Sequence, residues 1–257
     1  MSTYLRRITI GALAALPLAL APGAASADHA NGGYTATLAE INDSGGSGMF
    51  SMTIDDDRAT VELSWSGLAA EFDGGPYPHV QHIHIGADGV CPTQDLDANG
   101  DGIVNTPEGS SAYGAVGTTL SLSGPTGPGA ATDIGVAPGG GSTTYSRTFT
   151  MNQKTLDAIS DGTGVVVVHG LNPADLSQEA QDASSPLVPE LPQAATAPAL
   201  CGPLRAMPAG GVAAGAGDAS GGAENLGMIG VGAGLALAGG ATLALRRRQS
   251  KPEGASA

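Results

Sequence analysis

The sequence predicts an all-β domain, a Greek-key antiparallel sandwich or barrel, on three observations. Apolar and polar residues alternate with a period of two in several segments, as they do in half-buried strands. Clusters of Gly, Pro, Asn and Asp separate these segments and indicate turns. About seven short strands of this kind are typical of two packed sheets. The sequence contains no Rossmann glycine pattern, P-loop or internal repeat.

The expected strands follow one another through the first two thirds of the chain. They cover residues 34–38, 49–54, 60–65, 79–85, 115–122, 144–150 and the apolar run 165–169. One short helix is expected over 152–160, because Leu156 and Ile159 share a face and Asn152 can cap the first turn. The Pro/Ala-rich stretch 186–198 is expected to be extended.

Both ends of the chain carry targeting signals. Residues 1–27 begin with paired arginines, continue with an apolar stretch and end in a small-residue cleavage site, which is typical of a secretory signal peptide. Residues 226–245 contain no charge, can span roughly 30 Å of hydrocarbon as a helix, and are followed by three arginines. We therefore expect a single-pass cell-membrane protein with an extracellular N-terminal domain. Twin-arginine export, and a glycine-rich segment that never inserts, are the alternatives.

These segments divide the chain into five parts. A signal peptide (1–27) precedes one extracellular β-domain (28–205), which is long enough to bury a core. A Gly/Ala-rich linker (206–225) then leads to the transmembrane helix (226–245) and a cytoplasmic tail (246–257).

The formal charge of the part of the chain expected to be extracellular limits the classes of molecule that it can bind. Outside the signal, span and tail, four basic residues stand against 23 of the 24 acidic residues, a formal charge of −19. The four are Arg58, Arg147, Lys154 and Arg205. Such a surface disfavours nucleic acid and anionic lipid as partners and favours cations.

Two histidines on one strand are candidate metal ligands. His82 and His84 are two residues apart, so their side chains leave the strand on the same face. Neutral imidazole suits copper or zinc. A third ligand is needed, and His169, at the end of the apolar run 165–169, is the candidate. The alternative is that these are surface or hydrogen-bonded structural histidines.

The segment 97–108 fits the calcium-loop pattern. Oxygen ligands stand at positions 1, 3 and 5, glycine at position 6, a backbone carbonyl at 7 and further ligands at 9 and 12. The residues that would bind are Asp97, Asn99, Asp101, Ile103 through its carbonyl, Asn105 and Glu108. Neither flank reads as a good amphipathic helix, so we expect a calcium loop between strands rather than a helix–loop–helix. An acidic turn without an ion is the alternative.

The two cysteines, Cys91 and Cys201, both fall in the domain expected to be exported. An even count in an oxidising compartment suggests one disulfide that closes a long loop. Two free thiols are the alternative.

These features together resemble copper/zinc superoxide dismutase and its bacterial relatives, including CHRD-type β-domains. The chain shares the His-x-His strand, a following Gly89 and Cys91, a late Val-Val-His ending at His169, and a Cys-Gly at Cys201. The resemblance spans roughly residues 33–203. It implies an eight-stranded Greek-key barrel with copper held by His82, His84 and His169, a disulfide between the two cysteines, and superoxide as the substrate.

The chain also departs from that family. No histidine lies between His84 and His169, so the bridging ligand and the zinc-site histidines are missing. The family's guiding arginine precedes the last Cys-Gly, where this chain has Pro198, Ala199 and Leu200. The sequence therefore predicts a copper-binding surface domain with weak dismutation, or a non-catalytic CHRD-type domain for metal binding or adhesion.

Overall fold

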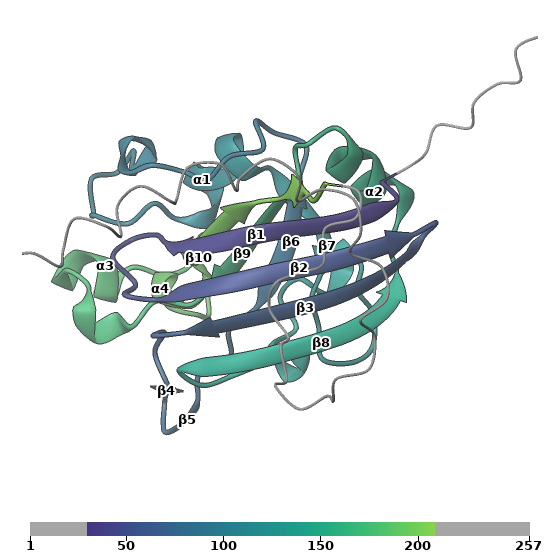
Figure 1. Ribbon diagram of the computed structural model, residues 1–257. Coiled ribbons are helices and arrows are strands. Elements are labelled where there is room, and N and C mark those ends of the chain that lie inside the picture. The colour runs from purple at the N-terminus through teal and green to yellow at the C-terminus, as the bar shows by residue number, and fades with distance from the viewer. Residues whose placement is uncertain (1–29, 209–257) are drawn as a thin grey trace, which may run out of the picture. The chain divides into compact units, whose positions relative to one another are not determined.

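The structure, a computed structural model, describes residues 30–208 (Figure 1). The expected signal peptide, the transmembrane segment, the tail and all but the first residues of the linker lie outside the described residues. Within 30–208 no helix has the length and apolar character needed to cross a membrane.

Four long strands form the first half of the sheet. β1 (Gly32–Glu40), β2 (Ser47–Asp55) and β3 (Arg58–Ser66) follow one another as a meander, and β8 (Ser142–Thr150) pairs with the outer edge of β3. Buried and exposed residues alternate without interruption along β3. The period-two pattern of the sequence therefore becomes one buried and one solvent-facing side, as it does in antiparallel sheets.

Four shorter strands form the second half, in the order β7-β6-β9-β10. Their bounds are Gln81–Ile85 for β6, Ala115–Thr119 for β7, Val165–His169 for β9 and Pro198–Pro203 for β10. β1 joins the halves, since it pairs with β2, with β10 at its end and with β11 (Arg205–Ala206) near its start. All the pairs are antiparallel, which confirms the all-β antiparallel fold.

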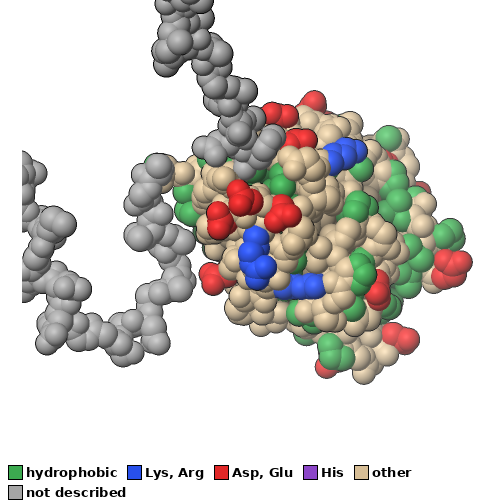
Figure 2. Space-filling model, turned by 90° about the vertical axis from the view of Figure 1, so that its right-hand side faces the viewer, with side chains coloured by type: hydrophobic (Ala, Val, Ile, Leu, Met, Phe, Trp, Pro, Cys, Tyr) green, Lys and Arg blue, Asp and Glu red, His purple; other side chains and the backbone are tan. Residues whose placement is uncertain are grey.

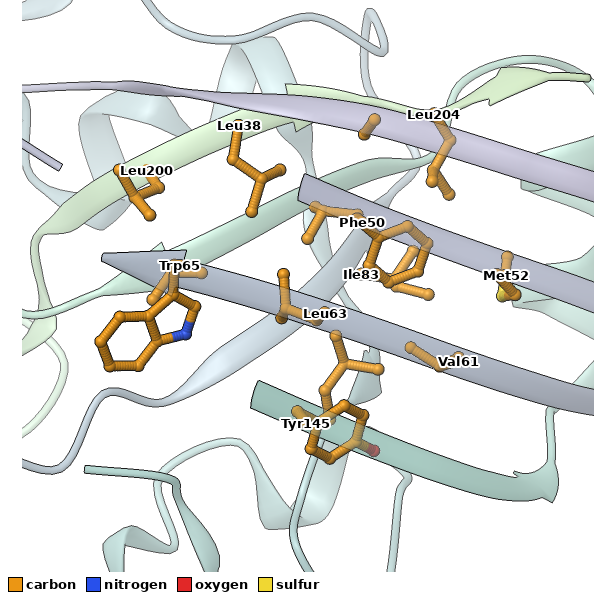
Figure 3. Packing of buried hydrophobic residues seen from close by; sticks show 14 of the residues in the cluster. Leu38, Phe50, Met52, Val61, Leu63, Trp65, Ile83, Tyr145, Leu200 and Leu204 are labelled. Carbon is orange, nitrogen blue, oxygen red and sulfur yellow. The ribbon is translucent and has the colours of Figure 1, made fainter. Parts of the chain in front are cut away.

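The main core fills the space between the two halves (Figure 3). Leu38, Phe50 and Leu63 project from the first half, and they meet Ile83 and Leu200 from the second. None of these five side chains is more than 1 % exposed. Burial of each contributes roughly 1.5–3 kcal/mol, so this core is the main source of stability.

The second half-sheet is buried on both faces. All five residues of β9 are buried, which explains its continuous apolar run. On the outer face Val165, Val167 and Cys201 pack with Tyr113 in a second small cluster. The expected disulfide between Cys91 and Cys201 is confirmed, with 5.8 Å between the Cα atoms. It ties the segment after β6 to the strand β10.

The short elements surround these sheets. The expected helix is confirmed as α2 (Gln153–Ser160), and the Asn152 side chain accepts a hydrogen bond from the Thr155 backbone. The remaining described elements are the two-residue strands β4 (Glu71–Phe72) and β5 (Gly75–Pro76), the helices α1 (Thr106–Tyr113), α3 (Gln178–Asp182) and α4 (Gln193–Thr196), and 3-10 turns at Gln94–Leu96, Pro128–Ala130, Ile134–Val136 and Pro173–Asp175.

A helix, α1, follows the acidic loop, because Asn105 and Glu108 form a reciprocal capping box at its start and Pro107 occupies its first turn. Only the 3-10 turn at Gln94–Leu96 precedes the loop, so the loop is not part of a full helix–loop–helix, as expected. Another expectation was wrong. The stretch 186–198 is not simply extended: it includes α4 and packs onto the domain, with Ala194 and Ala197 buried.

The face of the domain shown in Figure 2 carries acidic side chains in several places and few basic ones.

Candidate metal centre

His82 and His84 lie on β6, on the face turned away from the main core. In the pairing of β6 with β9, His82 stands opposite Val167 and His84 opposite Val165. Directly paired residues point to the same face, and side chains alternate along a strand. His169, two residues after Val167, therefore joins the pair on that face.

The structure brings these three histidines together. One ring nitrogen from each lies within 4.8 Å of those from the other two. The ring centroids are 5.5 Å apart for His82 and His84, and 5.1 and 5.7 Å from those two rings to His169. None of the three side chains is more than 3 % exposed. The spacing of the histidines on two adjacent strands thus creates one buried cluster.

One nitrogen of each ring is fixed by a backbone carbonyl. The contacts are His82 Nε2 to the Ala131 oxygen at 3.0 Å, His84 Nδ1 to the Gly114 oxygen at 2.9 Å, and His169 Nδ1 to the Thr196 oxygen at 2.8 Å. A carbonyl oxygen only accepts hydrogen bonds, so each of these nitrogens carries the proton and donates it. The tautomer of all three rings follows from these contacts.

The other nitrogen of each ring is buried and has no hydrogen-bond partner within residues 30–208. These are Nδ1 of His82, Nε2 of His84 and Nε2 of His169. In a neutral ring this nitrogen bears a lone pair. An unsatisfied buried acceptor costs roughly 1–3 kcal/mol, so three in one place need a reason. A metal ion bound by the three lone pairs satisfies them all, and the donor set suits copper or zinc.

Burial also keeps these rings neutral. It lowers the pKa of His84 to about 4, despite the hydrogen bond to Gly114. Burial, with the repulsion from a charged His84, lowers the pKa of His169 to about 3. The pKa of His82 also falls well below its ordinary value, through burial and then repulsion from the other two rings. At neutral pH the three nitrogens are therefore available as ligands without the release of a proton.

A cavity of about 120 Å³ opens onto the three histidines. Apart from the histidines, the residues that line it include no ionisable group except the phenol of Tyr77, and most are apolar. They come from β4, from the segment before β6, from the start of α1, from β7, from residues 131–134 and from the stretch 187–196. The Pro/Ala-rich stretch that the sequence analysis expected to be extended thus forms one wall of the site.

His79 is a residue whose position the sequence analysis did not anticipate. It is fully buried and lies outside the cluster, and its Nδ1 and Nε2 lie 2.9 Å from the carbonyl oxygens of His169 and Ala69. Its ring meets that of Trp65 edge-on at 4.9 Å. His79 therefore holds the backbone of a cluster histidine rather than joining the cluster. Only the His-x-x-His spacing of His79 and His82 pointed to it.

The acidic loop lies between β6 and α1, and its carboxylates are occupied by backbone N–H groups. Asp97 accepts from Gly100 and Gly102, and Asp101 accepts from Ile103. Elsewhere in the loop the Asn99 side chain accepts from the Asp101 backbone, and Glu108 accepts from Ala98 and Asn105. Within the described part of the chain these carboxylates do not form a second ligand cluster like that of the histidines. Calcium binding by this loop stays a prediction.

Comparisons with known proteins add little. No protein-family model matches the sequence, and no curated protein matches it. Among solved structures, a point mutant of superoxide dismutase 5 from Candida albicans is similar at 14 % identity and a TM-score of 0.37. The match covers 74 % of this chain and 98 % of that one. This likeness is too distant to assign a family or an activity.

Proposed function

We propose that this domain binds one copper ion through Nδ1 of His82, Nε2 of His84 and Nε2 of His169. The observation that carries the proposal is the convergence of three buried lone pairs, each with its tautomer fixed by a carbonyl contact. Carbonyl partners of this kind orient the ligating histidines in metal proteins. No other role for three adjacent unsatisfied nitrogens follows from the contacts of the described residues.

Copper is preferred over zinc for two reasons. An all-imidazole set binds copper(II) more tightly than zinc in the general order of divalent metals. The disulfide Cys91–Cys201 also indicates an oxidising compartment, where copper(II) is stable. Bound copper would supply one-electron transfer, while the protein holds the ion, keeps the three rings neutral and limits access to the cavity.

Metal analysis of the purified chain tests the proposal. We expect about one copper per chain after loading and dialysis. His82→Ala and His169→Ala should each reduce the copper content at least tenfold, because two histidines hold the ion weakly. His29→Ala, a histidine outside the described residues, is the matched control and should keep the metal. Full copper retention in His82→Ala would refute the site.

Superoxide dismutation is the activity that the sequence resemblance implies, and we propose that it is weak here. Fast reaction with an anion relies on positive potential at the metal. The cavity has no basic side chain besides the histidines, and the domain around it is strongly acidic. A superoxide-consumption assay should show a slow rate that is lost in His82→Ala. A rate equal to that of the variant would favour the non-catalytic CHRD-type alternative, metal binding or adhesion at the cell surface.

We also propose that the domain is exported and anchored in the membrane by residues 226–245. The support is the sequence pattern at both ends together with the disulfide. Protease treatment of intact cells should remove the β-domain and leave a fragment that contains the tail. Protection of the whole chain would contradict this topology.

A further inference from the structure

The backbone carbonyl of Thr196, which orients His169, accepts hydrogen bonds from two groups. His169 Nδ1 lies 2.8 Å from this oxygen, and the Thr106 hydroxyl donates to it at 2.5 Å. A carbonyl oxygen has two lone pairs, so it can accept both hydrogen bonds. Thr106 is the first residue of α1, and Thr196 is the last residue of α4. The oxygen that fixes the tautomer of a candidate ligand is therefore held by a residue 90 positions earlier in the chain.

The Thr106 hydroxyl also lies near His169 itself, with 3.4 Å between Oγ1 and Nδ1. A hydroxyl has a single proton to donate. If it donated this proton to Nδ1, the ring proton would have to sit on Nε2, and that nitrogen could not bind a metal ion. The shorter contact with the Thr196 oxygen favours donation to the carbonyl instead. Nδ1 then keeps its own proton, and Nε2 stays free as a ligand.

A carboxylate from the acidic loop holds the other end of α4. The Gln193 side chain donates to Oδ2 of Asp101 at 2.8 Å, and both residues are buried. Asn99 donates to the same oxygen, and the Ile103 backbone donates to Oδ1. A buried carboxylate is costly unless it accepts hydrogen bonds, so the contact with Gln193 is strongly favoured. Because α4 has only four residues, fixing Gln193 at its start also restrains Thr196 at its end.

We propose that Thr106 and Asp101 are positioning residues for the copper centre. Thr106 holds the Thr196 carbonyl directly, and Asp101 holds it through Gln193. Neither residue is a proposed copper ligand, and both act on the orientation of His169. The inference rests on the proposed copper site for its functional meaning, but the hold on the His169 ring can be measured without metal. The acidic loop thus has a role at the centre whether or not it binds calcium.

The first test removes the Thr106 hydroxyl from the full chain. Thr106→Ala and Thr106→Ser differ only by that hydroxyl, as do the control variants Thr163→Ala and Thr163→Ser. The Thr163 hydroxyl also donates to a backbone carbonyl, that of Ala158 in α2, at 3.0 Å.

The measured quantity is the exchange of the His169 Nδ1 proton with solvent, followed by NMR in the metal-free chain. This exchange should be at least threefold faster in Thr106→Ala than in Thr106→Ser, because the carbonyl that retains the proton is less firmly held. The two Thr163 variants should exchange this proton at the same rate. Equal rates in the two Thr106 variants would overturn the role of Thr106.

The second test removes the side-chain amide of Gln193. Gln193→Leu should also speed the exchange of the His169 Nδ1 proton, because α4 loses its contact with Asp101. Gln153→Leu breaks a similar hydrogen bond in α2, from Gln153 to Asp157 at 2.8 Å, and should leave the exchange unchanged. The backbone amides of β3 report global unfolding. If they accelerate as much as the ring proton, or if the two leucine variants behave alike, the role given to Asp101 is wrong.

Copper titration separates this inference from the copper site. Thr106→Ala should bind copper about three- to tenfold more weakly than Thr106→Ser, as expected for one lost hydrogen bond. A parent chain that binds no copper would reject the metal proposal, while proton exchange in the metal-free chain would still decide the positioning. Equal copper affinity of the two Thr106 variants, with a parent chain that binds copper, would reject only the positioning.

Discussion

The carbonyl oxygen of Gly114 accepts a hydrogen bond from Nδ1 of His84 at 2.9 Å. Gly114 follows α1 directly and has a φ of 86°, a conformation that favours glycine. A Cβ atom at this position would collide with the backbone carbonyl of Ile85. The orientation of a candidate ligand therefore depends on one glycine at the end of a helix.

Gly114→Ala should both destabilise the fold and weaken metal binding, since the clash displaces the carbonyl that holds His84. We expect a loss of about 2–4 kcal/mol in the free energy of unfolding, measured by urea denaturation, and a lower copper affinity. Gly162→Ala is the control: its φ is 75°, but an added Cβ meets no atom within 4 Å. That variant should lose only about 1 kcal/mol and keep its copper affinity. Equal losses in the two variants would contradict the role given to Gly114.

Acid should destabilise the metal-free protein through the buried histidines. The pKa of His84 is about 4 in the folded state, against an ordinary histidine value of 6.5, so below pH 6.5 the unfolded chain binds more protons than the native one. The free energy of unfolding therefore falls as the pH drops from about 6.5 to about 4, by up to about 1.4 kcal/mol per pH unit for each such group.

The variant His84→Gln isolates this effect. Glutamine cannot titrate and can still donate to the Gly114 carbonyl. The variant also removes the repulsion by which His84 lowers the pKa of His82 and His169, so it weakens the acid effect of the whole cluster. Thermal unfolding between pH 7 and pH 4, in the presence of a chelator, should show a shallower pH dependence for the variant than for the parent chain. Parallel curves would show that His84 does not carry a lowered pKa.

Loss of the disulfide should cost much of the stability. Cys91 and Cys201 are 110 residues apart in sequence, and the chain-entropy relation gives about 4–5 kcal/mol for a loop of that length. We expect the double variant Cys91→Ala/Cys201→Ala to unfold at lower urea concentration by about this amount. Its copper content at low temperature should be unchanged, because neither cysteine is among the proposed ligands. A difference below about 1 kcal/mol would contradict the expectation.

Calcium binding by the loop 97–108 can be tested without disturbing the fold. Glu108→Gln removes a carboxylate at the twelfth position but keeps a residue that is accepted in the capping box of α1. We expect millimolar calcium to raise the Tm of the parent chain and to have a much smaller effect on Glu108→Gln. Asp133→Asn, a change in another loop aspartate that accepts a backbone N–H, is the control. If calcium does not change the Tm of the parent chain, the hypothesis that the loop binds calcium is wrong.

Strands with alternating apolar and polar residues, or with a continuous apolar segment, were predictable from the sequence. Strands with neither pattern were not. β9 has the predicted bounds, residues 165–169, because four consecutive valines leave no alternative to a strand buried on both faces. β10 was missed because the segment Pro198–Pro203 is short and bounded by prolines, and its burial on both faces removes any alternation. α1 was missed since its stability lies in the cap at Asn105 and not in an apolar face.

The sequence was enough to predict which histidines form the cluster, but not which nitrogen of each ring is free to bind a metal ion. The two-residue spacing and the family resemblance point to His82, His84 and His169, and the structure brings these three together. Which nitrogen of each ring is free depends on the carbonyls of Ala131, Gly114 and Thr196. Every residue has a backbone carbonyl, so no pattern of side chains in the sequence indicates which carbonyls will contact the histidines. The same holds for the cavity wall at 187–196, which only the tertiary fold places beside the histidines.

The distance in sequence between the parts of the centre has a consequence for how the protein matures. His82 and His84 are synthesised early, His169 follows 85 residues after His84, and the carbonyl that orients it belongs to Thr196. A chain that emerges from its amino end exposes the first pair long before the rest exists, and closing so long a loop is slow. Selective metal loading must then follow folding, because α4, which carries Thr196 and is made near the end of the domain, completes the centre.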